Sequence, residues 1–224
     1  LMKIELVRAG VRPPFPMVLH VHAVVMGAFM LTLLAQTGLM ATGRRGYHMQ
    51  LGLLGYALAA LLVVVGFVLV PTMYGQVWQG AQMAPPDAKD QAQRLLLQVD
   101  NIALLQYRIG ILFPLFLAIA FKARGRNAGM HKRMMFLGTA MALPAATDRI
   151  TWLPTTMPES PLAVDFYTLA AVAPMFLWDI VRNRTVHPAY AIWLAINIPF
   201  SIAVNWLWST AWWHETAPRI MGVA

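Results

Sequence analysis

The sequence predicts an all-α fold, a polytopic membrane helical bundle of about six transmembrane helices. Two features of the composition indicate this class: 59% of the 224 residues are hydrophobic, and only 12% are charged. Soluble domains average about 25% charged residues. In addition, the apolar residues come in runs of about 20, the length of a helix that crosses the hydrocarbon core of a bilayer.

Six segments are apolar and long enough to be predicted as membrane spans. In chain order they are residues 17–40, 48–70, 102–121, 131–149, 162–181 and 189–212. The fourth span is the shortest and has the most polar ends, since it begins at His131 and finishes with Asp148 and Arg149. Prolines inside the third, fifth and sixth spans predict kinks, because proline donates no backbone hydrogen bond.

Basic residues predict how the spans are oriented. The loops 41–47, 122–133 and 182–188 lie on one side and hold nine of the seventeen Lys and Arg residues. Because short cytoplasmic loops are enriched in Lys and Arg, both termini are expected on the non-cytoplasmic side. Lys3, Arg8 and Arg12 argue for the opposite orientation, but three basic loops outweigh one terminus.

The remaining segments complete the predicted organisation. Residues 1–16 are expected to be an N-terminal interfacial segment, and residues 17–213 are expected to be a single transmembrane helical domain. The long connection at 71–101 is expected to be an outer loop that carries a short interfacial helix from Asp87 onward. Residues 214–224 are a C-terminal tail.

Several classes of function are disfavoured by the composition. The chain has no cysteine, which excludes disulfides, thiolate metal sites and thiol catalysis. Its net charge of +8 is explained by orientation in a membrane, so nucleic acid is not an expected partner. Sequence motifs of soluble hydrolases, zinc proteases and nucleotide-binding loops are absent, and whether the protein is an enzyme stays open.

One face of the second span combines a histidine with small residues. His48, Gly52 and Gly55 lie close together at 100° per residue. This face allows either close packing of a neighbouring helix or the approach of a porphyrin with His48 as axial ligand. His131 and Gly138 repeat the pattern on the fourth span, and His20 lies on a similar face of the first. If haem is bound, His48 and His131 are the expected axial pair.

Charged residues at the outer ends of the spans predict a second site. Arg108 lies about two turns inside the third span, where a charge is costly and usually faces the bundle. Carboxylates are its expected partners. This outer set is either a ligand-binding pocket or a network of ion pairs that locks the helices together, and it comprises Asp100, Arg108, Asp148, Arg149 and Asp165.

Two stretches carry a resemblance to known families. In "GYHMQLGLLGY" and "GMHKRMMFLGTAMALPAATDR" the chain resembles a group of uncharacterised bacterial multi-spanning inner-membrane proteins with "HRRLG"-like and "HKRLM"-like motifs. It departs from that group at "HMQLG". The "HKRMM" stretch is also similar to small membrane proteins of cytochrome oxidase assembly. The resemblance implies a location in the bacterial cytoplasmic (inner) membrane. It also singles out the histidines of these motifs, but it implies no reaction.

The sequence therefore suggests three hypotheses for the function. The first is a membrane protein of electron transfer, which binds haem b or a quinone or serves as an accessory subunit of a respiratory or photosynthetic complex. The second is a transporter or a lipid- or anion-binding protein that uses the outer charged pocket. The third is a metal-dependent membrane hydrolase. Membrane lipids, and subunits of a larger membrane complex, are the expected partners.

Overall fold

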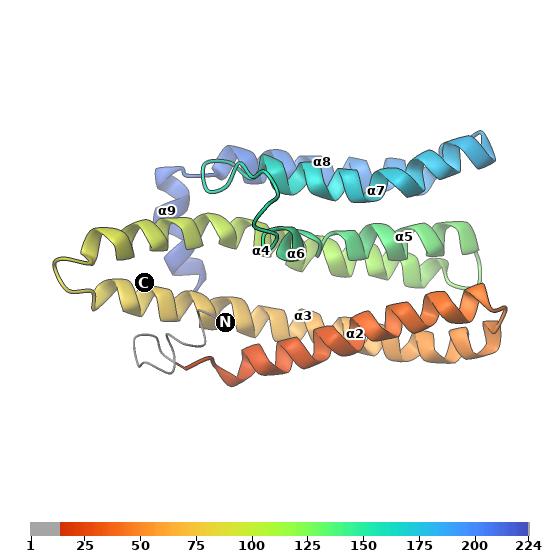
Figure 1. Ribbon diagram of the computed structural model, residues 1–224, viewed down its shortest axis with the longest axis horizontal. Helices are drawn as coiled ribbons and strands as arrows, with labels where there is room; N and C mark the ends of the chain where they lie inside the picture. The colour runs from red at the N-terminus through yellow and green to blue at the C-terminus, as the bar shows by residue number, and fades with distance from the viewer. Residues whose placement is uncertain (1–13, 224) are drawn as a thin grey trace. The chain divides into compact units, whose positions relative to one another are not determined.

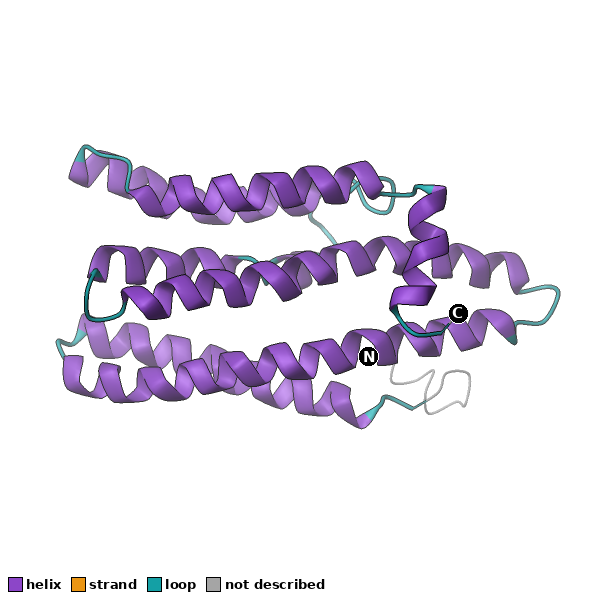
Figure 2. Ribbon diagram, turned by 180° about the vertical axis from the view of Figure 1, so that it is seen from behind, coloured by secondary structure: helices purple, strands orange, loops and turns teal. Residues whose placement is uncertain are grey.

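A computed structural model describes residues 14–223 of the chain. Within these residues the secondary structure is helical with no strand, which confirms the predicted all-α class (Figure 2). The helices, labelled as in Figure 1, are α2 (Met17–Ala41), α3 (Arg45–Gln82), α4 (Lys89–Ala123), α5 (Ala128–Ala140), α6 (Pro144–Thr147), α7 (Leu162–Asn183), α8 (Pro188–Leu207) and α9 (Ala211–Ile220).

Five of these helices are long and apolar enough to cross a membrane, and they are α2, α3, α4, α7 and α8. The first four contain the predicted spans 17–40, 48–70, 102–121 and 162–181, and α8 covers the first part of the span 189–212. Together the five helices are consistent with a multi-pass membrane protein. A sixth span and the side of the membrane on which the termini lie stay predictions.

The chain forms two compact units, and the boundary between them falls within the sequence of α4. The described part of the first unit is residues 14–93 together with 221–223, and the second unit is Arg94–Ile220. A single transmembrane domain over residues 17–213 therefore stays a prediction. Of the expected N-terminal segment 1–16, residues 1–13 lie outside the described part.

The predicted fourth span, 131–149, is not one continuous helix. α5 ends at Ala140, and the four-residue helix α6 follows after a turn. Pro144 explains the break, because it has no N–H to bond to the carbonyl of Ala140. That carbonyl accepts instead from the N–H of Leu143 at 3.1 Å, which tightens the end of α5 into a three-residue turn.

Residues 71–101 were expected to form an outer loop, and this expectation is wrong. α3 continues through Pro71 to Gln82, and α4 starts at Lys89, so the connection is only residues 83–88. The predicted short helix after Asp87 is the first part of α4. Pro85 and Pro86 end the helical run where Pro71 does not, since two consecutive prolines remove two donors and restrict the residues before them.

The C-terminal end is also more regular than predicted. α8 ends at Leu207, before the predicted end of the sixth span at 212, and a separate helix, α9, begins at Ala211 and continues into the expected tail 214–224. Ser209 forms the corner between α8 and α9 with a φ of 58°, a left-handed conformation that turns the chain out of the direction of α8. In Figure 1, α9 runs across the direction of α8.

In the first unit, α2 and α3 pack side by side along their lengths (Figures 1 and 2). Gly43, with a φ of 71°, makes the turn that reverses the chain between them. Gly55 lies at the contact, because a Cβ built on it would be 3.5 Å from Cγ2 of Thr32. Small residues at this point let the two helices approach closely, as is common in membranes.

In the second unit, the hydrophobic core joins α4, α5, α7 and α8. Its fully buried centre includes Phe116, Leu137 and Trp193. Gly138 of α5 packs directly on α4, since a Cβ there would lie 3.1 Å from Cβ of Phe116. This core fixes the four helices around the polar networks described below.

Candidate functional site

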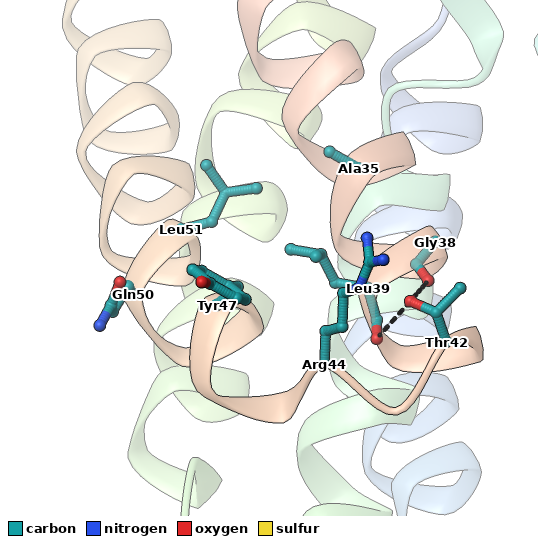
Figure 3. A pocket seen from close by; sticks show the side chains of 8 residues that line it. All are labelled: Ala35, Gly38, Leu39, Thr42, Arg44, Tyr47, Gln50 and Leu51. Carbon is teal, nitrogen blue, oxygen red and sulfur yellow. Dashed lines mark hydrogen bonds between the residues drawn. The ribbon is translucent and has the colours of Figure 1, made fainter.

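The first unit has an open groove at the end where α2 turns into α3. Its volume is about 1090 Å³, and it is a shallow surface groove rather than an enclosed pocket. Figure 3 shows the eight residues that line it, which come from the last turns of α2, the turn and the first turns of α3. They are Ala35, Gly38, Leu39, Thr42, Arg44, Tyr47, Gln50 and Leu51.

The groove has an apolar wall and a polar rim. Ala35, Leu39 and Leu51 supply aliphatic carbon, and a Cβ built on Gly38 would meet nothing within 4 Å. Thr42 holds the end of α2 by donating its hydroxyl to the carbonyl of Gly38 at 2.8 Å (Figure 3). This arrangement suits a molecule with a hydrocarbon part and a polar head.

Three rim residues supply hydrogen-bonding groups to the same groove. Arg44, Gln50 and Tyr47 are among the residues that line it. Arginine donates to oxygen acceptors in a planar fork, and an aromatic ring offers a face on which a flat molecule can stack. These groups therefore match a planar head that carries oxygen acceptors.

The first unit also contains the predicted histidines His20 and His48. His20 lies exposed on α2, and His48 lies half-buried in the first turn of α3, four residues after Arg44 of the groove. Gly52 is half-buried one turn beyond His48, and Gly55 packs against α2. The small-residue face of α3 was predicted to allow either helix packing or the approach of a porphyrin. At Gly55, this face packs against α2.

In the second unit, Arg108 is the centre of a buried network. It is 4% exposed, and its Nη1 lies 2.6 Å from Oδ1 of Asp165 on α7. Its Nη2 donates to Oδ1 of Asn197 on α8 at 2.9 Å. Of the three carboxylates expected near Arg108, the structure pairs it with Asp165.

The same carboxylate binds two further residues of α8. Ser201 donates to Oδ2 of Asp165, and Asn205 donates to that oxygen at 3.4 Å. Asn197, Ser201 and Asn205 follow each other at intervals of four residues, so they form one polar stripe on α8. A cavity of about 10 Å³, room for one water molecule, lies beside the network and is lined by Arg108 and Thr168.

The other residues of the predicted outer pocket lie elsewhere. Asp148 and Arg149 are exposed in the turn that follows α6. Asp100 is buried and belongs to a separate cluster with α9, where its Oδ2 lies 2.9 Å from Nδ1 of His214 and its carbonyl accepts from Nε1 of Trp213 at 2.7 Å. The predicted set is therefore divided between three places.

The neighbouring residue Asn101 completes the contact with the corner between α8 and α9. Its Nδ2 donates to Oγ of Ser209 at 2.9 Å, and its Oδ1 accepts from the N–H of Ser209 at 2.9 Å. Two consecutive residues of α4 thus hold the strained corner and the first turns of α9. The arrangement is a structural clamp.

His131 lies in the first turn of α5 and contacts α4. Its Nδ1 lies 2.9 Å from the carbonyl oxygen of Ala120, so this nitrogen carries the proton. A proton on Nδ1 is also the arrangement in most histidines that bind a metal through Nε2. Gly138, two turns further along α5, packs against Phe116 and Leu117. His131 belongs to the second unit and His48 to the first, so an axial pair stays a prediction.

Sequence reasoning missed the strongest ion pair of the second unit. Arg133 of α5 binds Asp179 of α7 through two hydrogen bonds of 2.5 Å, in the bidentate geometry that favours arginine. The hydroxyl of Tyr190 on α8 donates to Asp179 at 2.6 Å, and Asn183 donates at 3.0 Å. The sequence contained a signal for this pair, because it places Arg133 and Asp179 at the same membrane surface. The sequence does not show, however, which helices are neighbours.

Histidine side chains also serve structural roles at this end of the second unit. Nδ1 of His187 accepts from the N–H of Ala189 at 3.1 Å and so caps α8. Its Nε2 lies 3.0 Å from the point where a Cβ of Gly129 would be. Among residues 14–223, no three His, Asp or Glu side chains gather as a metal-binding group.

Comparison of the chain with protein-family models, with curated proteins and with solved structures finds no match.

Proposed function

We propose that this chain is a multi-pass membrane protein of electron transfer that binds a flat amphiphilic molecule of the quinone class. The groove between α2 and α3 is the observation that carries the proposal, because it joins an apolar wall to a rim of hydrogen-bond donors. Its position at a turn between two span-length helices suits a ligand that resides in the lipid phase. The resemblance of "HKRMM" to cytochrome oxidase assembly proteins supports the same class of function.

Each part of the groove has a role in this proposal. The isoprenoid or alkyl tail lies along Ala35, Leu39 and Leu51, while Arg44 and Gln50 donate hydrogen bonds to the carbonyl oxygens of the ring. The aromatic ring of Tyr47 offers a face on which the quinone ring stacks. A bacterial cytoplasmic membrane, and an accessory role in a respiratory or photosynthetic complex, are the proposed setting.

Filling the groove tests the proposal. Gly38→Leu places an aliphatic side chain into the groove at a position whose Cβ meets nothing, so the helix is expected to fold as before. Gly27→Leu is the matched control, since Gly27 also has open space, lies outside the groove and shares the same face of α2. Titration of each protein in nanodiscs with decylubiquinone measures the dissociation constant.

The expected result is a dissociation constant at least about tenfold higher for Gly38→Leu and unchanged for Gly27→Leu. Arg44→Gln is expected to weaken binding by a similar factor, because a hydrogen bond from a charged donor contributes about 1.5–3 kcal/mol. Equal binding by the native chain and Gly38→Leu would rule the groove out as the quinone site.

The haem version of the proposal has a separate test. Nδ1 of His131 carries the proton, as it does in histidines that bind haem iron through Nε2, and this supports His131 as an axial ligand. An absorption spectrum of the purified protein, before and after dithionite, should show a Soret band that disappears in His131→Ala. Absence of the band in the native protein removes the haem version without affecting the quinone proposal.

The anion-binding alternative is less well supported. The guanidinium of Arg108 is already contacted by Asp165 and Asn197, so an anionic ligand would have to displace a buried carboxylate. Such a buried pair is costly to break, because the remaining charge stays without a partner. Asp148 and Arg149, which the alternative also requires, are exposed in another turn.

A further inference from the structure

Exposed basic side chains gather at the end of the second unit where α5 and α8 begin and α7 ends. Lys122 and Arg126 flank the end of α4, Lys132 lies in the second turn of α5, and Arg182 and Arg184 lie at the end of α7. All five are exposed. We refer to these five residues as the basic end.

Contacts within the second unit bring the segments of the basic end together. Arg133 of α5 binds Asp179 of α7, and Tyr190 of α8 binds the same carboxylate. The imidazole of His187, between α7 and α8, packs over Gly129 at the start of α5. The five cations are therefore carried by neighbouring segments of one packed unit.

Acidic side chains do not neutralise this end. In segments 118–133 and 179–190 the single carboxylate is Asp179, which is buried and already held by Arg133, Tyr190 and Asn183. Charges within about 8 Å of one another interact at physiological salt, because this is the screening length. The basic end thus presents an unneutralised positive surface.

The connections that carry these charges are too short to reach far from a membrane. α4, α7 and α8 have the length and apolarity of spans, and the connections at the basic end are only residues 124–127 and 184–187. The exposed cations therefore lie at the level of lipid headgroups. Arginine and lysine at this level bind phosphate oxygens well, with arginine able to make two parallel hydrogen bonds.

We propose that the basic end is a binding site for the phosphate of an anionic membrane lipid, held jointly by the α4–α5 and α7–α8 connections. The bound headgroup bridges two connections that are far apart in the sequence and stabilises the packing of α5 against α7 and α8. Anionic phospholipid thereby acts as a structural ligand of the second unit, separately from the groove of the first unit.

The test compares lipid retention in two matched variants. Lys132→Gln/Arg182→Gln removes one lysine and one arginine from exposed helical positions of the basic end. Lys89→Gln/Arg94→Gln removes the same two residue types from exposed helical positions in the first turns of α4. Each protein is reconstituted in nanodiscs of equal phosphatidylglycerol and phosphatidylcholine, extracted into mild detergent and analysed by native mass spectrometry.

The expected result is phosphatidylglycerol retained by the native chain and by the Lys89→Gln/Arg94→Gln control, with retention reduced at least about tenfold in Lys132→Gln/Arg182→Gln. Lys132→Arg/Arg182→Lys, which keeps both charges, should retain the lipid. Phosphatidylglycerol should also raise the unfolding temperature of the native chain relative to phosphatidylcholine alone.

Two outcomes would overturn the proposal. Equal retention in the native chain and Lys132→Gln/Arg182→Gln would show that the lipid binds elsewhere. An equal rise in unfolding temperature on adding inorganic phosphate to phosphatidylcholine nanodiscs would assign the site to a soluble anion.

Discussion

At the scale of single residues, the polar side chains of the second unit act as links between helices. Arg108 and Asp179 each bind residues from two other helices. In a low-dielectric interior a charge without a partner is very unfavourable, so each of these residues depends on the others for its stability. His187 lies outside the spans, and the charges of Arg133 and Asp179 in the second of these clusters act on its pKa.

The pKa of His187 is predicted to make the stability of the second unit depend on pH. Burial lowers this pKa below its ordinary value of 6.5, and the positive charges of Arg133 and Lys132 lower it further, while Asp179 partly opposes them. The unfolded chain therefore takes up this proton more readily than the folded chain. The stabilising contribution is complete above pH 6.5 and is lost as the pH falls from there through the lowered pKa of the folded chain.

His187→Asn separates this titration from the capping role. Asparagine keeps an acceptor for the N–H of Ala189 but has no proton to gain. Thermal unfolding between roughly pH 7.5 and 5.5 should show a loss of stability on acidification that is smaller in His187→Asn than in the native chain. The same slope in both proteins would mean that other groups govern the pH dependence.

At the scale of helices, close packing depends on glycine only where two backbones meet. A Cβ on Gly138 of α5 would lie 3.1 Å from Cβ of Phe116 and 3.3 Å from Cδ2 of Leu117, both on α4. Gly66 of α3 lies in an equally helical segment, but a Cβ there would meet nothing within 4 Å. The two glycines look alike in the sequence and differ in what surrounds them.

This difference gives a paired prediction for Gly138→Ala and Gly66→Ala. The first should lower the free energy of unfolding by about 1–3 kcal/mol, because a well-packed contact must open to admit the methyl group. The second should leave it unchanged or raise it by up to about 1 kcal/mol, since alanine is the better helix former. Chemical unfolding in mild detergent measures both; equal effects would contradict the close contact of α4 and α5.

At the scale of the whole molecule, the number of membrane crossings depends on residues 128–147. α5 has 13 residues, about 20 Å of helix, and α6 adds only one further turn. Neither helix reaches the length of a span alone. If α5, its turn and α6 cross together, the chain has six crossings, and both termini lie on the same side.

Single cysteines can decide this, because the native chain contains none. Arg126→Cys, Glu159→Cys, Arg184→Cys and Pro86→Cys place thiols at exposed positions in four connections. With six crossings, a membrane-impermeant maleimide should label positions 126 and 184 from the cytoplasmic side and 86 and 159 from the other. Labelling of 126 and 159 from the same side would show that α5 and α6 do not cross.

The sequence predicted the helices well where length and apolarity alone determine the outcome. Four of the six expected spans lie within helices of suitable length, and α8 covers most of a fifth, 189–212. The helix ends were harder to predict, because proline acts according to its surroundings: α3 continues through Pro71, whereas Pro144 accompanies the break after α5. A local sequence pattern does not contain the tertiary contacts that compensate for a lost hydrogen bond.

The candidate sites, too, were predictable from the sequence only in part. Arg108 was expected to bind a carboxylate, since a charge within a span requires a partner. The identity of that partner, Asp165 rather than Asp100 or Asp148, was decided by the packing of α4 against α7. The groove lined by Arg44 and Tyr47 was not predicted, because its lining residues come from two helices and the turn between them.

The sequence by itself thus determined that the protein is helical and that its helices are long and apolar enough for a membrane, since hydrophobicity and helix length are properties of local segments. Only the tertiary structure decided which helices are neighbours, which charges neutralise each other and which glycines serve packing. These outcomes depend on contacts between residues far apart in the chain, such as Arg133 with Asp179 and Asp100 with His214. Side-chain pairing across helices depends on distances in space, which local patterns in the sequence do not show.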